Sequence, residues 1–338
     1  MLPRLGWADV ARAAAIALVV LYHVGGAWID AVLAETGRVG AMIGAVNELL
    51  LTVRMPLFFL VSGMLATRAL DRPFAAVRRS RILDLLWPYA IWSLAFAPCW
   101  AFAYGAGLAD LPRALGWIPE LSGAYWYLPA LVVFFLAARA AGRHRAALLG
   151  VAVLLWLCAP VLAPFVTTLP AGLTLYRLMT FFVWFVAGAT LRSVLDRMAG
   201  APPALGLVLA VSWTVLSLLD RSSAWSITPA LSLLGVTAAV MLCGAAARIP
   251  RVASAGRFLG GRTLAIYLMH PVALTVLVIV IPPIPGGDLA ALVLVVGATT
   301  LLTAGPAVLR PHLPDGLFRL PLPSRRAEGE REALAPVA

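Results

Sequence analysis

The chain has 338 residues, of which 62% are hydrophobic and only 12% are charged, and its mean hydropathy is +0.95. Soluble proteins carry about 25% charged residues, so this chain has too few charges to cover its surface with polar groups. The composition therefore excludes a soluble globular protein and indicates an integral membrane protein.

The net charge of +11 comes from arginine alone, because the sequence contains no lysine. The arginines form short clusters between hydrophobic segments, which is typical of membrane topology and not of a nucleic-acid-binding face. Cys99, Cys158 and Cys243 lie inside hydrophobic segments without a pairing or metal-binding spacing. We therefore expect no disulfide framework, no metal site and no nucleic-acid partner.

Hydrophobic segments long enough to cross a bilayer follow one another along the chain. A membrane-spanning helix needs about 20 apolar residues. The sequence predicts an all-α, polytopic membrane helix bundle of about ten transmembrane helices, at residues 7–28, 40–66, 82–104, 123–140, 146–165, 172–191, 203–219, 225–247, 259–281 and 289–309. Residues 1–310 would form this domain. Residues 311–338, rich in Pro, Arg and Glu, would form a disordered cytoplasmic tail.

The distribution of arginines between alternate loops predicts the orientation of the bundle. Placing the N-terminus in the cytoplasm puts 20 arginines on that side and three on the other. Cytoplasmic loops of membrane proteins carry an excess of positive residues. We therefore expect both termini in the cytoplasm.

The first segment contains two ionisable residues, Arg12 and His23. An ionisable group inside a membrane span is costly and marks a functional site by default. Eleven residues of helix place the two side chains about 20° apart and about 16 Å along the axis, so they share one face. Arg12 would lie near the cytoplasmic third and His23 near the outer third. Each alone could have a structural role, but together they favour function.

The second segment contains Arg54 near mid-membrane, preceded by Glu48. The two residues point to different faces of a regular helix, so Glu48 is expected to pair across helices, and Arg177 is a candidate partner. The small pair Ser62–Gly63 favours close helix packing more than catalysis.

Arg78 and Arg81 are three residues apart at the cytoplasmic end of the third segment. On a regular helix they would be neighbours, and two guanidinium groups could bind a phosphate. The alternative is an ordinary positively charged membrane anchor.

Aromatic residues open the fourth segment, and a histidine lies inside the ninth. The run Tyr125–Trp126–Tyr127 suits an aromatic belt at the outer membrane surface, although such rings also stack on sugars. His270 precedes Pro271, which weakens the helix there. We count Arg54, Glu48, Tyr125, Trp126, Arg177 and His270 as possible acceptor-site or cavity residues.

Five stretches resemble, in order, the acyltransferase 3 family of membrane-bound O-acyltransferases, bacterial proteins that modify surface glycans and lipids. They are Asp9 to His23, Met55 to Gly63, Arg78 to Tyr89, Tyr125 to Leu128, and Leu264 to Pro271. The resemblance implies ten spans in the bacterial inner membrane, with acyl-CoA as co-substrate and no bound cofactor. It implies His23 as the catalytic histidine with Arg12 as its partner, and Arg78 and Arg81 as acyl-CoA-binding residues.

The expected activity is transfer of an acyl group, most simply acetyl, from cytoplasmic acyl-CoA to a hydroxyl of a cell-surface glycan or glycolipid precursor. His23 could accept the hydroxyl proton, because imidazole titrates near neutral pH, or could itself be acylated first. The alternative function is a transporter or flippase of lipid-linked sugars. Transporters often show internal repeats, and the sequence shows none.

Overall fold

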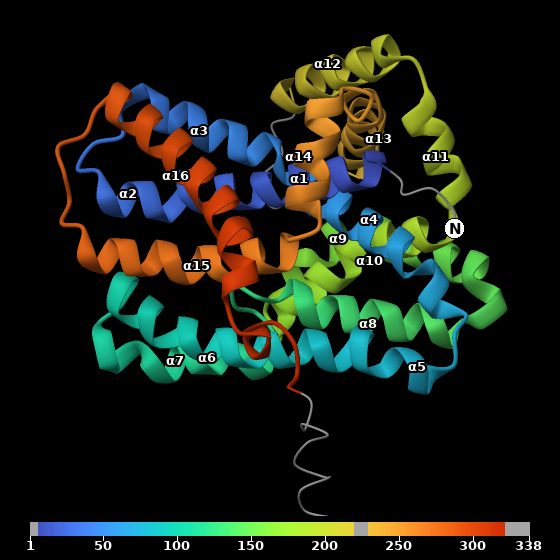
Figure 1. The fold of residues 1–338 in the computed structure, drawn as a ribbon, viewed down its shortest axis with the longest axis horizontal. Coiled ribbons are helices and arrows are strands. Elements are labelled where there is room, and N and C mark those ends of the chain that lie inside the picture. The colour runs from blue at the N-terminus through green and yellow to red at the C-terminus, as the bar shows by residue number, and fades with distance from the viewer. Residues whose placement is uncertain (1–5, 220–228, 322–338) are drawn as a thin grey trace, which may run out of the picture.

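The computed structural model describes residues 6–219 and 229–321, which are helical apart from connecting segments (Figure 1). The longer helices are α1 (Gly6–His23), α3 (Gly37–Leu49), α4 (Leu51–Leu70), α6 (Asp84–Tyr104), α7 (Leu111–Glu120), α8 (Tyr127–Ala140), α9 (Arg145–Val166), α10 (Gly172–Thr190), α11 (Arg192–Gly200), α12 (Pro203–Leu219), α13 (Pro229–Ala246), α14 (Pro250–Gly260), α15 (Thr263–Val280) and α16 (Asp288–Leu309). Short helices are α2 (Ile29–Val32) and α5 (Phe74–Arg78), with η3 (Gly107–Asp110), η4 (Gly142–His144), η5 (Arg310–His312) and η6 (Asp315–Leu317) as single turns. The predicted all-α class is confirmed.

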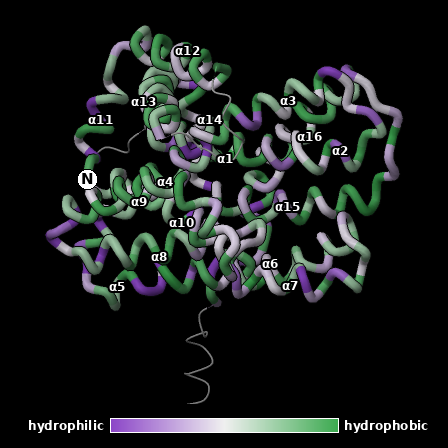
Figure 2. Tube along the Cα trace, turned by 180° about the vertical axis from the view of Figure 1, so that it is seen from behind, coloured by the Kyte–Doolittle hydropathy of each residue, from purple (hydrophilic) through white to green (hydrophobic). Residues whose placement is uncertain are grey.

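Eight helical stretches among the described residues are long and apolar enough to cross a membrane. A ninth is the pair α11 and α12, which is bent by 102°. The predicted fourth span contains only the shorter apolar helix Tyr127–Ala140, so eight or nine of the ten predicted spans are long enough to cross a membrane in the described part of the chain. The start of the predicted eighth span, residues 225–228, lies outside that part. Hydrophobic residues dominate helices such as α12 and α13 (Figure 2), and large apolar side chains on α12, α9 and α16 are exposed. The protein is therefore a multi-pass membrane protein.

The predicted second span is divided into two helices, α3 and α4, which meet at Leu50. Helix α4 is the more deeply buried and packs closely against α10. A Cβ atom added at Gly63 would collide with the Phe185 carbonyl, and one at Gly188 with the Leu60 carbonyl. The role of Gly63 in close helix packing is thus confirmed, because only glycine permits this approach of backbones.

Two wide helical turns of the π type interrupt the bundle. The first, η1 (Val24–Trp28), begins directly after His23 and contains Gly26, whose φ of −112° and ψ of −130° are not helical. The second, η2 (Arg79–Leu83), contains Arg81. Such turns often occur at functional sites. Both turns lie next to residues predicted to be functional.

The packed chain continues beyond residue 310, where the tail was expected to begin. Phe318 is buried, and the indole groups of Trp87 and Trp92 on α6 donate hydrogen bonds to the carbonyls of Gly316 and Leu317, at 2.7 and 2.8 Å. Arg310 lowers the pKa of the exposed Asp315 through a hydrogen bond. The chain is therefore bound to α6 as far as Leu320, whose N–H donates to Asp84, and the predicted tail from 322 lies outside the described residues.

Some residues used to predict the orientation also lie outside the described part of the chain. They are Arg4, Asp220, Arg221, Arg325, Arg326 and Arg331. The cytoplasmic placement of both termini stays a prediction.

Candidate functional site

Helices α1 and α15 together position the central polar residues. Arg12 donates a hydrogen bond of 2.9 Å to the hydroxyl of Thr263, at the first residue of α15. Farther along the same helices, the rings of His23 and His270 have centroids 5.2 Å apart. Arg12 and His23 therefore both face α15, in agreement with their shared face in the sequence. They do not contact each other directly, because eleven residues of α1 separate them.

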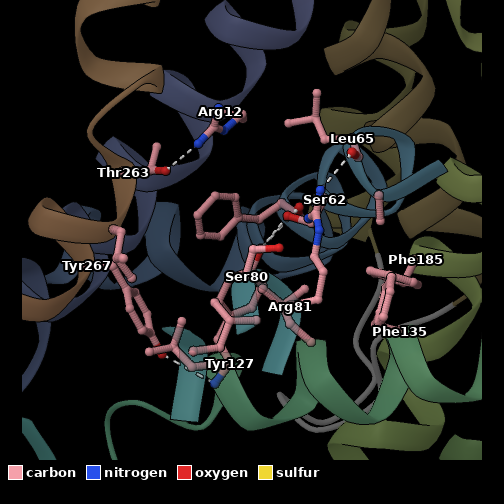
Figure 3. A pocket seen from close by; sticks show the side chains of 16 residues that line it. Arg12, Ser62, Leu65, Ser80, Arg81, Tyr127, Phe135, Phe185, Thr263 and Tyr267 are labelled. Atoms are coloured by element: carbon pink, nitrogen blue, oxygen red, sulfur yellow. Dashed lines mark hydrogen bonds between the residues drawn. The ribbon is translucent and has the colours of Figure 1, made fainter. Parts of the chain in front are cut away.

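A cavity of about 190 Å³ lies at the Arg12 end of this interface (Figure 3). Its polar lining comes from five elements and includes two guanidinium groups, three aliphatic hydroxyls and two phenols; these are Arg12, Ser62, Ser80, Arg81, Tyr127, Thr263 and Tyr267. The remaining lining is apolar and includes Phe58, Phe135 and Phe185. We call this space the arginine cavity. Two cations beside an apolar lining suit a ligand with one anionic and one hydrophobic part.

Tyr127 lines the arginine cavity and is held in place by a network of neighbouring groups. Its hydroxyl shares a hydrogen bond of 2.6 Å with Ser62, and its ring stacks on Phe58 at a centroid distance of 4.6 Å. Its backbone N–H donates to the hydroxyl of Tyr267, which in turn donates to the carbonyl of Ala124. Ser62 is thus a polar lining residue, in addition to being next to the packing residue Gly63.

A second group of residues, the histidine cluster, comprises Tyr22, His23, Arg54, Arg177 and His270. The guanidinium carbon of Arg54 lies 3.8 Å from the centroid of the Tyr22 ring. The rings of Tyr22 and His23 have centroids 5.0 Å apart, so Arg54 lies one ring away from His23. Tyr267 lines the arginine cavity and its ring centroid is 6.2 Å from that of His270, so Tyr267 connects the cavity with the cluster.

His270 is fully buried, with its Nδ1 atom 2.8 Å from the carbonyl oxygen of Ile266. A carbonyl oxygen can only accept, so Nδ1 carries the proton and Nε2 is left as an acceptor. No group among the described residues forms a hydrogen bond with Nε2. A buried acceptor without a partner is costly, so His270 can receive a hydrogen bond from His23 or from a bound hydroxyl.

The expected pairing of Glu48 with Arg177 is wrong. Glu48 is exposed, and Arg177 instead donates a hydrogen bond of 3.0 Å to the carbonyl of Ser122. The cause is the break at Leu50, because Glu48 belongs to α3 and not to the buried helix α4. Arg54 on α4 is buried and donates to the carbonyl of Asn47, at 3.1 Å.

Arg78 and Arg81 do not share one site in the structure. Arg81 lines the arginine cavity and donates a hydrogen bond to the carbonyl of Leu65, whereas Arg78 is exposed at the end of α5. The wide turn η2 changes the angle between successive residues, so a spacing of three no longer brings the two side chains to the same face.

The aromatic-belt interpretation of Tyr125 is also wrong. Tyr125 is 1% exposed, and its hydroxyl donates to the carbonyl of Leu268 on α15, at 2.8 Å. Trp126 is half-buried beneath Arg177, whose guanidinium carbon lies 4.9 Å from the ring centroid. The segment before α8 turns into the protein and not towards lipid.

Three lining residues, Thr263, Tyr127 and Tyr267, were missed as site residues. A signal was present for α15, because Thr263, Tyr267 and His270 follow the spacing i, i+4, i+7 that places residues on one helical face. Tyr127 offered no such signal, since its position depends on contacts with α4 and α15.

Comparison with known proteins identifies the family. Residues 5–309 match the family described as acyltransferase domain, acyltransferase 3. No curated protein and no solved structure matches the chain. The match includes α1, α4, α6, α8, α10 and α15, which carry the arginine cavity and the histidine cluster. The chain therefore belongs to the acyltransferase 3 family, and it is a membrane-bound acyltransferase.

Proposed function

We propose that the protein is a multi-pass O-acyltransferase of the bacterial inner membrane, which moves an acyl group from cytoplasmic acyl-CoA to a hydroxyl of a cell-surface glycan or glycolipid precursor. One observation carries the proposal: α1 and α15 hold a cationic cavity at one end and a histidine pair at the other. The cationic cavity suits the donor, and the histidine pair suits transfer of the proton from the acceptor hydroxyl.

Arg12 and Arg81 would bind the donor in the arginine cavity. A guanidinium group binds phosphate or a polarised carbonyl through charge-assisted hydrogen bonds. The cavity volume of about 190 Å³ is too small for a whole coenzyme A molecule. We therefore propose that it holds the phosphate-bearing end of the pantetheine arm, and that the arm carries the acyl thioester along α1 towards His23. Arg78, exposed nearby in the chain, would contact the nucleotide end.

His23 would handle the proton of the reaction. The acceptor oxygen attacks the thioester carbonyl, the imidazole takes the hydroxyl proton, and the carbon–sulfur bond breaks to release the coenzyme A thiol, which takes the proton back. The alternative route has His23 acylated first and deacylated by the acceptor hydroxyl. Both routes require an unprotonated nitrogen on His23. The Nε2 atom of His270 supports this, because it can accept a hydrogen bond from one ring nitrogen of His23 and leave the other nitrogen unprotonated.

The proposal is tested by mass spectrometry of surface glycans and glycolipids from cells that lack the gene and are complemented with variants. Wild type and His144→Ala should restore an acyl mass increment, whereas His23→Ala should not, at equal protein level in the membrane. His144 is an exposed histidine and serves as the matched control. Restoration by His23→Ala, or accumulation of whole lipid-linked sugars in the mutant cells, would contradict the proposal.

A further inference from the structure

Arg54 is a buried cation that forms no ion pair within residues 6–219 and 229–321. The residue is 3% exposed, its guanidinium donates a hydrogen bond to the carbonyl of Asn47, and its flat face lies over Tyr22. A carbonyl and an aromatic ring solvate the guanidinium in part, but they leave its full positive charge uncompensated.

Arg177 repeats this arrangement on the neighbouring helix. It donates to the carbonyl of Ser122, and its guanidinium lies over the ring of Trp126. The four ion pairs within residues 6–219 and 229–321 involve Arg79, Arg145, Arg192 and Arg310, and neither Arg54 nor Arg177. Helices α4 and α10 thus bring two unneutralised cations to the histidine cluster.

Two such cations inside a membrane protein are expensive unless an anion joins them. A charged group in a membrane span costs at least about 2.5–3.5 kcal/mol, and such residues pair with one another or with backbone carbonyls and mark substrate or ion pathways. Arg54 lies over Tyr22, whose ring centroid is 5.0 Å from that of His23, and Arg177 lies on the adjacent helix α10, so an anionic partner is expected to arrive with a substrate. The donor's phosphates are less suited to this role, because the arginine cavity already offers them Arg12 and Arg81.

We propose that Arg54 and Arg177 bind an anionic group of the acceptor, a carboxylate or a phosphate, and so hold its hydroxyl next to His23. The inference rests on the proposed function and deepens it by naming the chemical class of the acceptor. Tyr22 is 43% exposed, so the cluster reaches the surface of the protein at this residue. Guanidinium groups stacked on aromatic rings keep their N–H edges free, and these edges bind oxyanions in two-pronged fashion.

The test measures binding without turnover, by thermal shift of the purified full-length protein in detergent. The probes are two matched pairs: p-nitrophenyl β-D-glucuronide against p-nitrophenyl β-D-glucoside, and glucose 1-phosphate against glucose. The wild type should bind at least one anionic member about tenfold more tightly than its neutral partner. A response to the glucuronide indicates a sugar carboxylate, and a response to the phosphate indicates the phosphate of a lipid-linked sugar.

Arg54→Gln and Arg177→Gln should each lose this preference, with Arg177→Lys as a charge-retaining variant that keeps part of it. The matched control is Arg113→Gln, which removes an exposed arginine whose guanidinium lies 5.9 Å from the Trp100 ring, outside the cluster. The melting temperature without probe shows whether each variant folds, and the two glutamine variants lie on different helices.

Equal binding of charged and neutral probes by the wild type, including no binding of any, would overturn the inference. A preference for the anionic probes that survives both glutamine variants would also overturn it. The same holds if Arg54→Gln loses binding of coenzyme A and keeps binding of the anionic probe. His23→Ala should keep the preference, because the anion site does not depend on proton transfer. A protein that shows the preference but no acyl transfer would refute the proposed function and leave the anion site standing.

Discussion

Thr263 gives the sharpest test of the arginine cavity. Its hydroxyl accepts a hydrogen bond of 2.9 Å from Arg12, and the residue is 5% exposed. Thr263→Val keeps the shape of the side chain and removes only the acceptor. A hydrogen bond to a charged group contributes about 1.5–3 kcal/mol, and Arg12 makes at least one further interaction, so we take the lower end. A loss of about 1.4 kcal/mol corresponds to about tenfold.

The assay is steady-state acetyl transfer from radiolabelled acetyl-CoA by purified enzyme in lipid nanodiscs. We expect kcat/KM for acetyl-CoA to fall about tenfold in Thr263→Val, because Arg12 is no longer held in the cavity. Thr263→Ser keeps the hydroxyl and should stay within about threefold of wild type. Wild-type kinetics in Thr263→Val, or an equal loss in Thr263→Ser, would refute the reasoning, since the hydroxyl would then not be the operative group.

Three further predictions, which use five substitutions, test other parts of the structure. Arg81→Gln should raise KM for acetyl-CoA about tenfold, whereas Arg78→Gln should change it less, because only Arg81 lines the cavity; equal effects in the same transfer assay would contradict the geometry. His270→Leu should lower kcat with little change in KM, and His270→Gln, which retains an acceptor, should recover part of the lost kcat. Identical kcat values in the two variants would exclude a role for Nε2. Gly63→Ala should destabilise the protein by about 1–3 kcal/mol, because the new Cβ collides with the Phe185 carbonyl, and an unchanged midpoint in thermal or denaturant unfolding would count against this packing.

The sequence predicted the helical class and the positions of the hydrophobic segments, because bilayer thickness and hydropathy act locally along the chain. It also placed Arg12 and His23 on one face, since α1 is regular from Gly6 to His23. Both successes rest on constant helical geometry, which needs no knowledge of neighbouring helices.

The predictions failed where the backbone departs from that geometry or where contacts distant in sequence decide. The π turn at Arg79–Leu83 separates Arg78 from Arg81, and the break at Leu50 separates Glu48 from the buried helix. Tyr125 is buried because Leu268, far along the chain, accepts its hydroxyl. The binding of Gly316 and Leu317 to α6 likewise depends on Trp87 and Trp92, which hydropathy alone could not connect to them.

The central claim is that acyl-CoA binds from the cytoplasm and that His23 transfers its acyl group to an acceptor. The most direct measurement uses sealed, sided proteoliposomes that contain lipid-linked glycans extracted from cells lacking the gene. Membrane-impermeant acetyl-CoA is offered to one face at a time. Labelled glycan is expected only when the donor is on the cytoplasmic face, and none is expected with His23→Ala. Transfer only when the donor is on the opposite face would contradict the cytoplasmic binding of acyl-CoA. Transfer at the wild-type rate by His23→Ala would contradict the role of His23.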